Sequence, residues 1–282
     1  MRQIRPIPLF LAVCGAIALP GCSDGAPDKD RAANGAVGNA ATIPSHAATA
    51  NAADPGPGAQ AIESKADGLE FSYKWPAEAA AIPELNAWLR GNGDKLLADA
   101  RQQAKSDQAE AKKNGYPFNG HSYDEGYATV ANTPRALVLL SDGYVFTGGA
   151  HGMPIATAIL WDKGAKKRLA TGAVLDIPRL ATVAKPRFCK ELDAQRAEKR
   201  GEPVRHDDPN ELDDFVKCVD MTKQLILPIS TGGKALDTVR ISIGPYEAGP
   251  YAEGSYVIDL PMDAALLTTV KPAWKDAFMA AR

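Results

Sequence analysis

The sequence lacks the motifs that identify most enzymes. It contains no Gly-x-x-x-x-Gly-Lys phosphate loop, no His-Glu-x-x-His zinc motif, no Gly-x-Ser-x-Gly nucleophile elbow and no Cys-x-x-Cys pair. Histidine is also scarce, and His121, His151 and His206 lie far apart in the chain. We therefore expect no catalytic residue set, no metal site and no bound cofactor.

Clusters of positive charge are nearly absent. The chain has 32 Lys and Arg against 34 Asp and Glu, and loss of Arg2 and Arg5 with an N-terminal signal would leave a net charge of about −4. Proteins that bind nucleic acid usually present a basic face. The short run from Lys163 to Arg168 is better explained as an exposed turn. These features exclude nucleic acid from the expected partners.

Long apolar runs are missing except near the N-terminus. Leu9 to Leu19 form a run of 11 apolar-rich residues, whereas a membrane-spanning helix needs about 20. The run ends in Leu19-Pro20-Gly21-Cys22, the pattern of a lipoprotein signal that is cut before Cys22. We expect acyl chains such as palmitate on Cys22, which would anchor the chain to a membrane surface. The alternative is an ordinary secretory signal that contains a cysteine by chance.

The lipoprotein interpretation also predicts a location. Ser23, rather than Asp, follows the lipid site. In a cell with two membranes this favours the outer membrane, with the protein facing the periplasm.

Cysteine is rare in the rest of the chain. Cys14 would leave with the signal and Cys22 would carry the lipid, so Cys189 and Cys218 remain. Two cysteines in an oxidising compartment predict one disulfide. Closing that loop of about 30 residues would contribute roughly 3 to 4 kcal/mol. The alternative is a pair of unrelated thiols.

Composition divides the chain into four parts. Residues 1–21 form the signal peptide, and residues 22–68 form an Ala-, Gly- and Pro-rich tether without aromatic residues. Such a segment cannot bury enough apolar surface to fold, so we expect it to be disordered. Residues 69–145 and 146–282 form the N-terminal and C-terminal halves of the folded region.

Periodicity within the folded region predicts strand pairs joined by a few helices. Alternating apolar residues indicate strands at 69–75, 123–132, 135–146, 153–162, 168–171, 224–228, 237–243 and 255–260. Helices are expected from 83 to about 115 with a break at 91–93, over 177–201 with a break at Pro186, and over 271–280. The polar segment 202–214 should be exposed. The predicted class is α+β, with a largely antiparallel sheet and packed helices.

Two segments carry the candidate binding residues, which are Gly148, Gly149, His151, Tyr246 and Tyr251. The first, Tyr144 to Pro154, runs from one strand through three glycines and His151 into another strand, and glycines at such a corner permit positive φ and close backbone approach. The second, Ile243 to Gly254, places two Tyr residues in a loop rich in Gly and Pro. The structural alternative for the first segment is a tight corner with His151 bonded to backbone. For the second segment it is a loop that caps the core. We expect the two segments to lie near each other.

The same segments resemble a bacterial extracytoplasmic domain. Gly148-Gly149-Ala150-His151-Gly152, followed by Pro245-Tyr246-Glu247 and Pro250-Tyr251-Ala252-Glu253-Gly254, is similar to the ectodomain of RsiV-type anti-sigma factors. That domain also precedes the catalytic domain of PdaC-type peptidoglycan deacetylases and occurs in envelope lipoproteins. Phe71-Ser72-Tyr73-Lys74-Trp75-Pro76 and the helix with Asn86 extend the resemblance over about residues 69–265. It implies two intimately packed halves and, by analogy with RsiV-type proteins, lysozyme as a partner.

The chain departs from these families outside the shared domain. We identify no spanning helix or cytoplasmic segment, and the chain ends too soon after the domain to hold a deacetylase. The leading hypothesis is a lipid-anchored, non-enzymatic envelope protein that binds a protein such as lysozyme or a peptidoglycan glycan. One alternative is a cell-wall hydrolase that uses His151 and a nearby carboxylate as its acid/base pair. Another is a purely structural envelope component.

Overall fold

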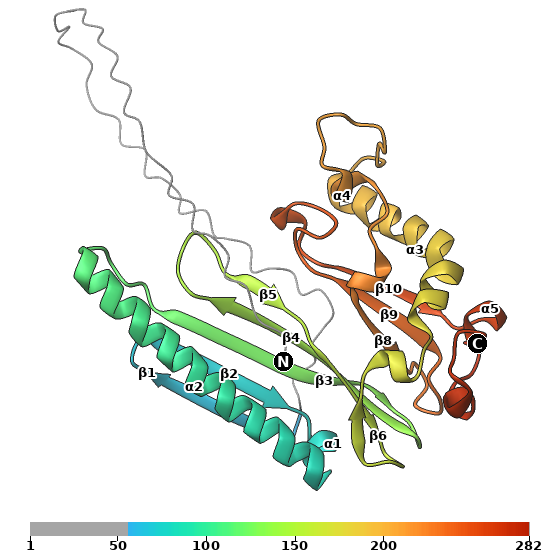
Figure 1. The fold of residues 1–282 in the computed structure, drawn as a ribbon, viewed down its shortest axis with the longest axis horizontal. Coiled ribbons are helices and arrows are strands. Elements are labelled where there is room, and N and C mark those ends of the chain that lie inside the picture. The colour runs from blue at the N-terminus through green and yellow to red at the C-terminus, as the bar shows by residue number, and fades with distance from the viewer. Residues whose placement is uncertain (1–55, 282) are drawn as a thin grey trace, which may run out of the picture. The chain divides into compact units, whose positions relative to one another are not determined.

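The computed structural model describes residues 56–281 as a helical and β-stranded unit (Figure 1). Cys22, the signal peptide and most of the predicted tether lie outside the described residues, so lipidation stays a prediction. Within residues 56–281, the strands form one seven-stranded and one three-stranded sheet. Nearly all strand pairs are antiparallel, which confirms the predicted α+β class.

The larger sheet contains the first seven strands, in the order β1-β2-β3-β4-β6-β7, and β5 pairs with β4. Only β2 and β3 pair in parallel among the described strands. A parallel pair needs a long crossover, which here is the helical segment α1 and α2. The strands and helices of this part are β1 (Gln60–Ala66), β2 (Leu69–Trp75), α1 (Ala77–Ala80), α2 (Pro83–Asn114), β3 (His121–Asn132), β4 (Ala136–Phe146), β5 (Met153–Ile155), β6 (Ala158–Asp162) and β7 (Lys167–Leu169).

The smaller sheet has the order β10-β9-β8 and packs against α3. Its strand β8 contacts β3, β4 and β6 of the larger sheet. The bounds are α3 (Ile177–Arg200), α4 (Asp213–Val216), β8 (Leu225–Ile229), β9 (Thr238–Ile243), β10 (Tyr256–Pro261) and α5 (Ala264–Leu267). Short 3-10 helices cover Thr171–Ala173, Met221–Lys223, Tyr251–Glu253 and Pro272–Ala277. The last one replaces the predicted helix at 271–280.

Strand β4 is buried on both faces and separates two hydrophobic clusters. Leu137 and Leu139 belong to a cluster with β2 and α2, whereas Val138 and Leu140 belong to a cluster with α3 and the smaller sheet. Successive side chains of a strand point to opposite faces, so one strand supplies both clusters. The second cluster contains residues of both sheets, which confirms the two packed halves.

The boundary between the halves lies later than predicted. We expected residues 146–282 to form the second half, but β5, β6 and β7 belong to the larger sheet. The reason is that β5 and β6 both pair antiparallel with β4. The division therefore follows Leu169, the last residue of β7.

The folded region also begins earlier than predicted. Residues 60–66, assigned to the tether, form β1 and pair with all of β2. Asp67 and Gly68 join the two strands with φ values of 55° and 75°. Two successive positive φ values characterise the tight hairpin turn favoured by Asp-Gly. The Asp-Gly pair could have revealed this edge strand, although Ile62 is its only large apolar residue.

Both predicted helix breaks are wrong. α3 continues through Pro186, because the buried residues Leu180, Ala184, Phe188 and Leu192 fix the opposite face of the helix. A helix-interior proline loses one hydrogen bond, which this packing offsets. α2 continues through Gly91-Asn92-Gly93, and Gly93 is buried against β1 and β2.

This packing predicts opposite effects for two alanine substitutions in α2. A Cβ at residue 93 would lie 2.7 Å from the Tyr73 ring and 2.8 Å from Ile62 Cδ1, whereas a Cβ at residue 91 meets nothing within 4 Å. We expect Gly93→Ala to lower the free energy of unfolding by about 1–3 kcal/mol. Gly91→Ala, the matched control, should raise it by about 0.5–1 kcal/mol. Urea titrations measure both, and a stabilising Gly93→Ala would contradict this packing.

Candidate functional site

The structure brings the two predicted segments together. The His151 ring stacks on the Tyr251 ring, with centroids 4.0 Å apart and planes at 23°. The Tyr251 hydroxyl donates a hydrogen bond to the Gly152 carbonyl over 2.9 Å. The expected proximity is therefore confirmed. We call His151, Tyr246 and Tyr251 the aromatic surface.

The glycine-rich corner connects β4 to β5 and packs against Tyr144 of β4. Gly148 and Gly149 have φ values of 102° and 88°, which few other residues adopt. The Gly152 amide donates to the Tyr144 hydroxyl over 2.7 Å, and a Cβ at residue 152 would lie 2.6 Å from the Tyr144 ring. This close approach requires a glycine at 152. Tyr144 begins the first candidate segment but was not among the candidate binding residues, because its position is that of an ordinary strand residue.

His151 is exposed and bonded to backbone. Its Nδ1 lies 2.9 Å from the Gly152 carbonyl oxygen, so Nδ1 carries the donated proton. Among residues 56–281, the histidines that contact carboxylates are His121 with Asp107 and His206 with Asp193. The described residues thus provide no carboxylate partner for His151. The acid/base pair that the hydrolase alternative needs is not assembled in this part of the chain.

Tyr246, like His151, is an exposed member of the aromatic surface. Its side chain is 50% exposed, and its ring centroid lies 5.6 Å from that of Tyr251. Its φ of 69° lies in the left-handed region, which is unusual for a bulky residue. Such strain persists only where the surrounding structure enforces it, and it is often found at functional sites.

Tyr251 is half-buried and connects the two loops. Burial, together with the neighbouring Tyr144 hydroxyl, raises the pKa of Tyr251 to about 12. The hydroxyl therefore remains protonated near neutral pH and can donate to Gly152.

A cavity of about 350 Å³ lies beside the aromatic surface, between the two sheets. Pro245 and Glu247, the neighbours of Tyr246, line it. Its apolar walls come from both sheets and include Val130, Leu140, Ile155, Leu225 and Val257. None of the five predicted binding residues lines the cavity. Sequence reasoning missed it because its walls come from six strands that are distant in the chain.

The charged residues of the cavity differ in how they are compensated. Arg240 is held by Asp259 through two bonds of 2.7 and 2.6 Å. Burial raises the pKa of Asp142, and the nearby Asp124 adds to this effect. In the described residues, no group of three or more His, Cys, Asp or Glu is arranged to hold a metal ion. Two of the charged groups that line the cavity are thus a neutralised cation and a carboxyl group that burial makes harder to ionise.

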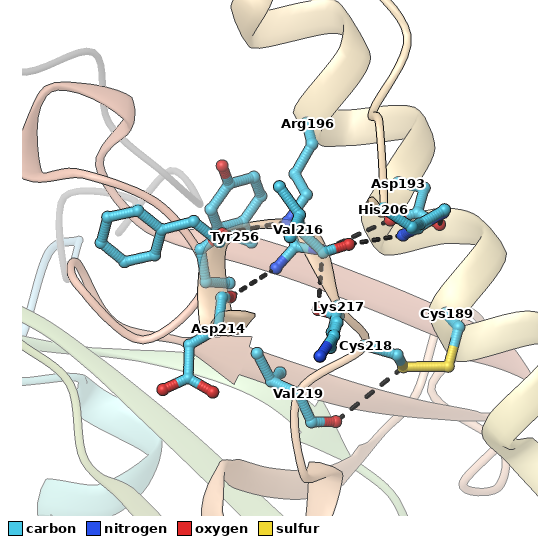
Figure 2. A network of polar contacts seen from close by, with 12 residues as sticks. Cys189, Asp193, Arg196, His206, Asp214, Val216, Lys217, Cys218, Val219 and Tyr256 are labelled. Carbon is cyan, nitrogen blue, oxygen red and sulfur yellow. Dashed lines mark hydrogen bonds and ion pairs between the residues drawn. A yellow bond between two sulfur atoms is a disulfide. The ribbon is translucent and has the colours of Figure 1, made fainter. Parts of the chain in front are cut away.

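The predicted disulfide is present and joins α3 to the segment that follows α4 (Figure 2). Cys189 of α3 is bonded to Cys218, with Cα atoms 5.3 Å apart. This is within the range that a disulfide can close without backbone movement. Figure 2 also shows Arg196, a buried cation that sequence reasoning missed. The signal was available, because Arg196 follows Leu192 by four residues in the buried stripe of α3.

The raised pKa of Tyr251 predicts a pH-dependent contribution to stability. At pH 7, Tyr251→Phe should lower the free energy of unfolding by about 0.5–1.5 kcal/mol, because the bond to Gly152 is lost. A phenol whose folded pKa is raised stabilises the fold fully below its unfolded pKa of 10.0, and loses that contribution as pH rises towards about 12. The difference in the free energy of unfolding between wild type and variant should therefore shrink from pH 9 to pH 11. Urea unfolding at each pH measures it, and a constant difference would contradict the assignment.

Comparison with known proteins gives a family match for part of this site. The family described as Deacetylase PdaC matches residues 62–154. No curated protein matches the chain. Two solved DUF3298 family proteins are similar in structure. The protein from Bacteroides fragilis has 15% identity and a TM-score of 0.44, with 72% of this chain and 89% of that chain covered. The protein from Pseudomonas aeruginosa PAO1 has 18% identity and a TM-score of 0.42, with 79% and 97% covered.

The family match is shorter than the resemblance expected from the sequence, which covered about residues 69–265. It begins at Ile62, inside β1, and ends at Pro154, inside β5. It includes the glycine-rich corner and His151, but not Tyr246 and Tyr251. Residues 62–154 of this chain thus match the PdaC family, which confirms the resemblance for that part.

Proposed function

We propose that this chain is an extracytoplasmic binding protein whose aromatic surface contacts a protein partner. The observation that carries the proposal is the meeting of two loops, one from each sheet. Together they support the exposed side chain of Tyr246. His151 and Tyr251 stack beside it and are tied by the bond from Tyr251 to Gly152. A rigid aromatic side chain held at a surface is the kind of residue that dominates protein interfaces.

Residues around Tyr246 support the same proposal. Met153, 39% exposed, lines the neighbouring cavity together with Pro245 and Glu247. Methionine and tyrosine are both enriched at protein interfaces. The cavity would accept a side chain that a partner inserts beside the aromatic surface.

Lysozyme is the first partner to test. The family resemblance suggests it, since the ectodomain of RsiV-type proteins binds lysozyme. A cell-wall glycan is the other outcome of the same test, because aromatic side chains also stack on sugar rings.

We also propose that the protein is a lipoprotein of the cell envelope. The sequence Leu19-Pro20-Gly21-Cys22 supports acylation of Cys22. The disulfide Cys189–Cys218 and the PdaC-type domain support an extracytoplasmic location. No helix within residues 56–281 is long and apolar enough to cross a membrane.

Tyr246→Ala should weaken partner binding with little effect on the fold. We expect a loss of about 1–2 kcal/mol of binding free energy, about 5- to 30-fold in affinity. The full chain, kept in solution by mild detergent, can be titrated with hen lysozyme and sedimented with purified peptidoglycan. Tyr116→Ala is the matched control, because Tyr116 is also 50% exposed and directly follows the C-terminal cap of α2.

The two probes separate the possible outcomes of that experiment. The proposal is supported if Tyr246→Ala binds lysozyme more weakly while Tyr116→Ala binds it as the wild type does. Binding to peptidoglycan alone replaces the protein partner with a glycan. Equal effects of Tyr246→Ala and Tyr116→Ala, or no binding to either probe, would overturn the proposal.

Cys22→Ser should abolish the membrane attachment of the protein. The acyl chains would be lost, and each buried methylene contributes about 0.8 kcal/mol to anchoring. Fractionation of cells, with mass spectrometry of the mature N-terminus, measures the change. An unmodified N-terminus at another position in the wild-type protein would exclude the lipid anchor.

A further inference from the structure

The loop from Gly244 to Ser255 carries Tyr246 and Tyr251 but contains little regular structure. Its single short helix covers Tyr251–Glu253. Within the loop, the amides of Glu247, Glu253 and Gly254 bond to nearby carbonyls. A loop of this kind would lose binding affinity if it had to be ordered by the partner. Its anchors therefore decide how well the aromatic surface is prepared for binding.

Arg196 is the most deeply buried anchor, with 0% of its surface exposed. Its Nε donates to the carbonyl of Ala248 in the loop over 2.9 Å. Its other nitrogens donate to the carbonyls of Lys217 over 2.9 Å and Asp214 over 2.8 Å, and to the Asp193 carboxylate over 3.3 Å. The planar guanidinium thus bridges two chain segments, the loop and residues 214–217 (Figure 2).

The next turn of α3 repeats this arrangement. Arg200 donates to both carboxylate oxygens of Glu253, over 2.9 and 3.1 Å, and to the carbonyl of Phe215 over 2.9 Å. Lys199 donates to the carbonyls of Glu253 and Ser255, each over 2.6 Å. The anchored residues Ala248 and Glu253 each lie two positions beyond a tyrosine of the aromatic surface.

The disulfide fixes the second segment that Arg196 binds. Cys218 follows Lys217, whose carbonyl accepts a bond from Arg196. Cys189 lies two turns before Arg196 on the same helix. The covalent bond therefore holds residues 214–217 against α3, where Arg196 and Arg200 reach both this segment and the loop.

We propose that Arg196 is a positioning residue for the aromatic surface, and that the Cys189–Cys218 disulfide acts on this surface through Arg196. In this arrangement the disulfide keeps the carbonyl acceptors in place, the acceptors orient the guanidinium, and the guanidinium holds Ala248. This inference deepens the proposed function, because it concerns the loop that would contact the partner.

Hydrogen exchange of the full chain, followed by mass spectrometry without any ligand, tests this inference. In Arg196→Met, amides of the peptide spanning residues 244–255 should exchange about tenfold faster, while peptides of β3 and β4 keep their rates. Arg196→Lys should behave in the same way, because a compact ammonium lacks the planar guanidinium fork that reaches Ala248 and residues 214–217 at once. Rates in 244–255 that stay unchanged, or that rise by the same factor as those of β3 and β4, would overturn the inference.

Two further variants control for general destabilisation and for failure to fold. Leu89→Ala creates a cavity in the cluster beneath α2 and should leave exchange in 244–255 unchanged. If Arg196→Met does not fold, Arg200→Gln removes the neighbouring anchor alone and should also accelerate exchange in 244–255. Unchanged exchange in that variant would count against anchoring of the loop by α3.

The contribution of the disulfide is tested separately. The double variant Cys189→Ser, Cys218→Ser should show the same selective increase in the exchange rate of residues 244–255. An unchanged rate in this variant would overturn the coupling between the disulfide and the loop. Because no ligand is present, these results do not depend on the identity of the partner. Failure of lysozyme and peptidoglycan to bind would overturn the proposed function and leave this inference standing.

Discussion

The fold depends on the burial of β4 on both faces. Its side chains alternate between the cluster beneath α2 and the cluster shared with α3 and the smaller sheet. A strand in this position must be apolar at successive residues, as Ala136 to Leu140 are. The face of β4 that carries Val138 and Leu140 is buried by α3 and the smaller sheet, so burial of this face joins the two halves.

The candidate site is a consequence of that arrangement. The corner after β4 and the loop after β9 belong to different sheets, yet they meet because the sheets share a hydrophobic cluster. The stacked rings of His151 and Tyr251 then join them at the surface. Within residues 56–281, His151 is bonded to backbone, and the histidines that contact carboxylates are His121 and His206.

Arg196 shows how a buried charge can organise irregular structure. Burial lowers the pKa of Arg196, and Asp193 opposes this effect. Leaving a buried charge without its partners costs about 3–5 kcal/mol, so the carbonyls of two separate segments are held firmly around it. A purely apolar contact at this position would not dictate the orientation of those carbonyls in the same way.

The sequence alone predicted the features that depend on local patterns. Alternation predicted most strands and the α+β class, and the count of cysteines predicted the pair Cys189 and Cys218. The resemblance predicted the PdaC-type domain. The sequence also contained local signals that we missed, namely the Asp67-Gly68 turn that adds β1 and the charged Arg196 within an apolar stripe.

Only the tertiary structure decided the features that join distant residues. Continuity of α2 through Gly93 depends on contact with Tyr73 and Ile62, and continuity of α3 through Pro186 depends on packing of the opposite helix face. The cavity between the sheets and the bridge from Arg196 to Ala248 combine segments up to about 130 residues apart, so no local pattern encodes them. Local sequence specifies backbone preference, whereas the position of one surface against another is set by the burial that all segments achieve together.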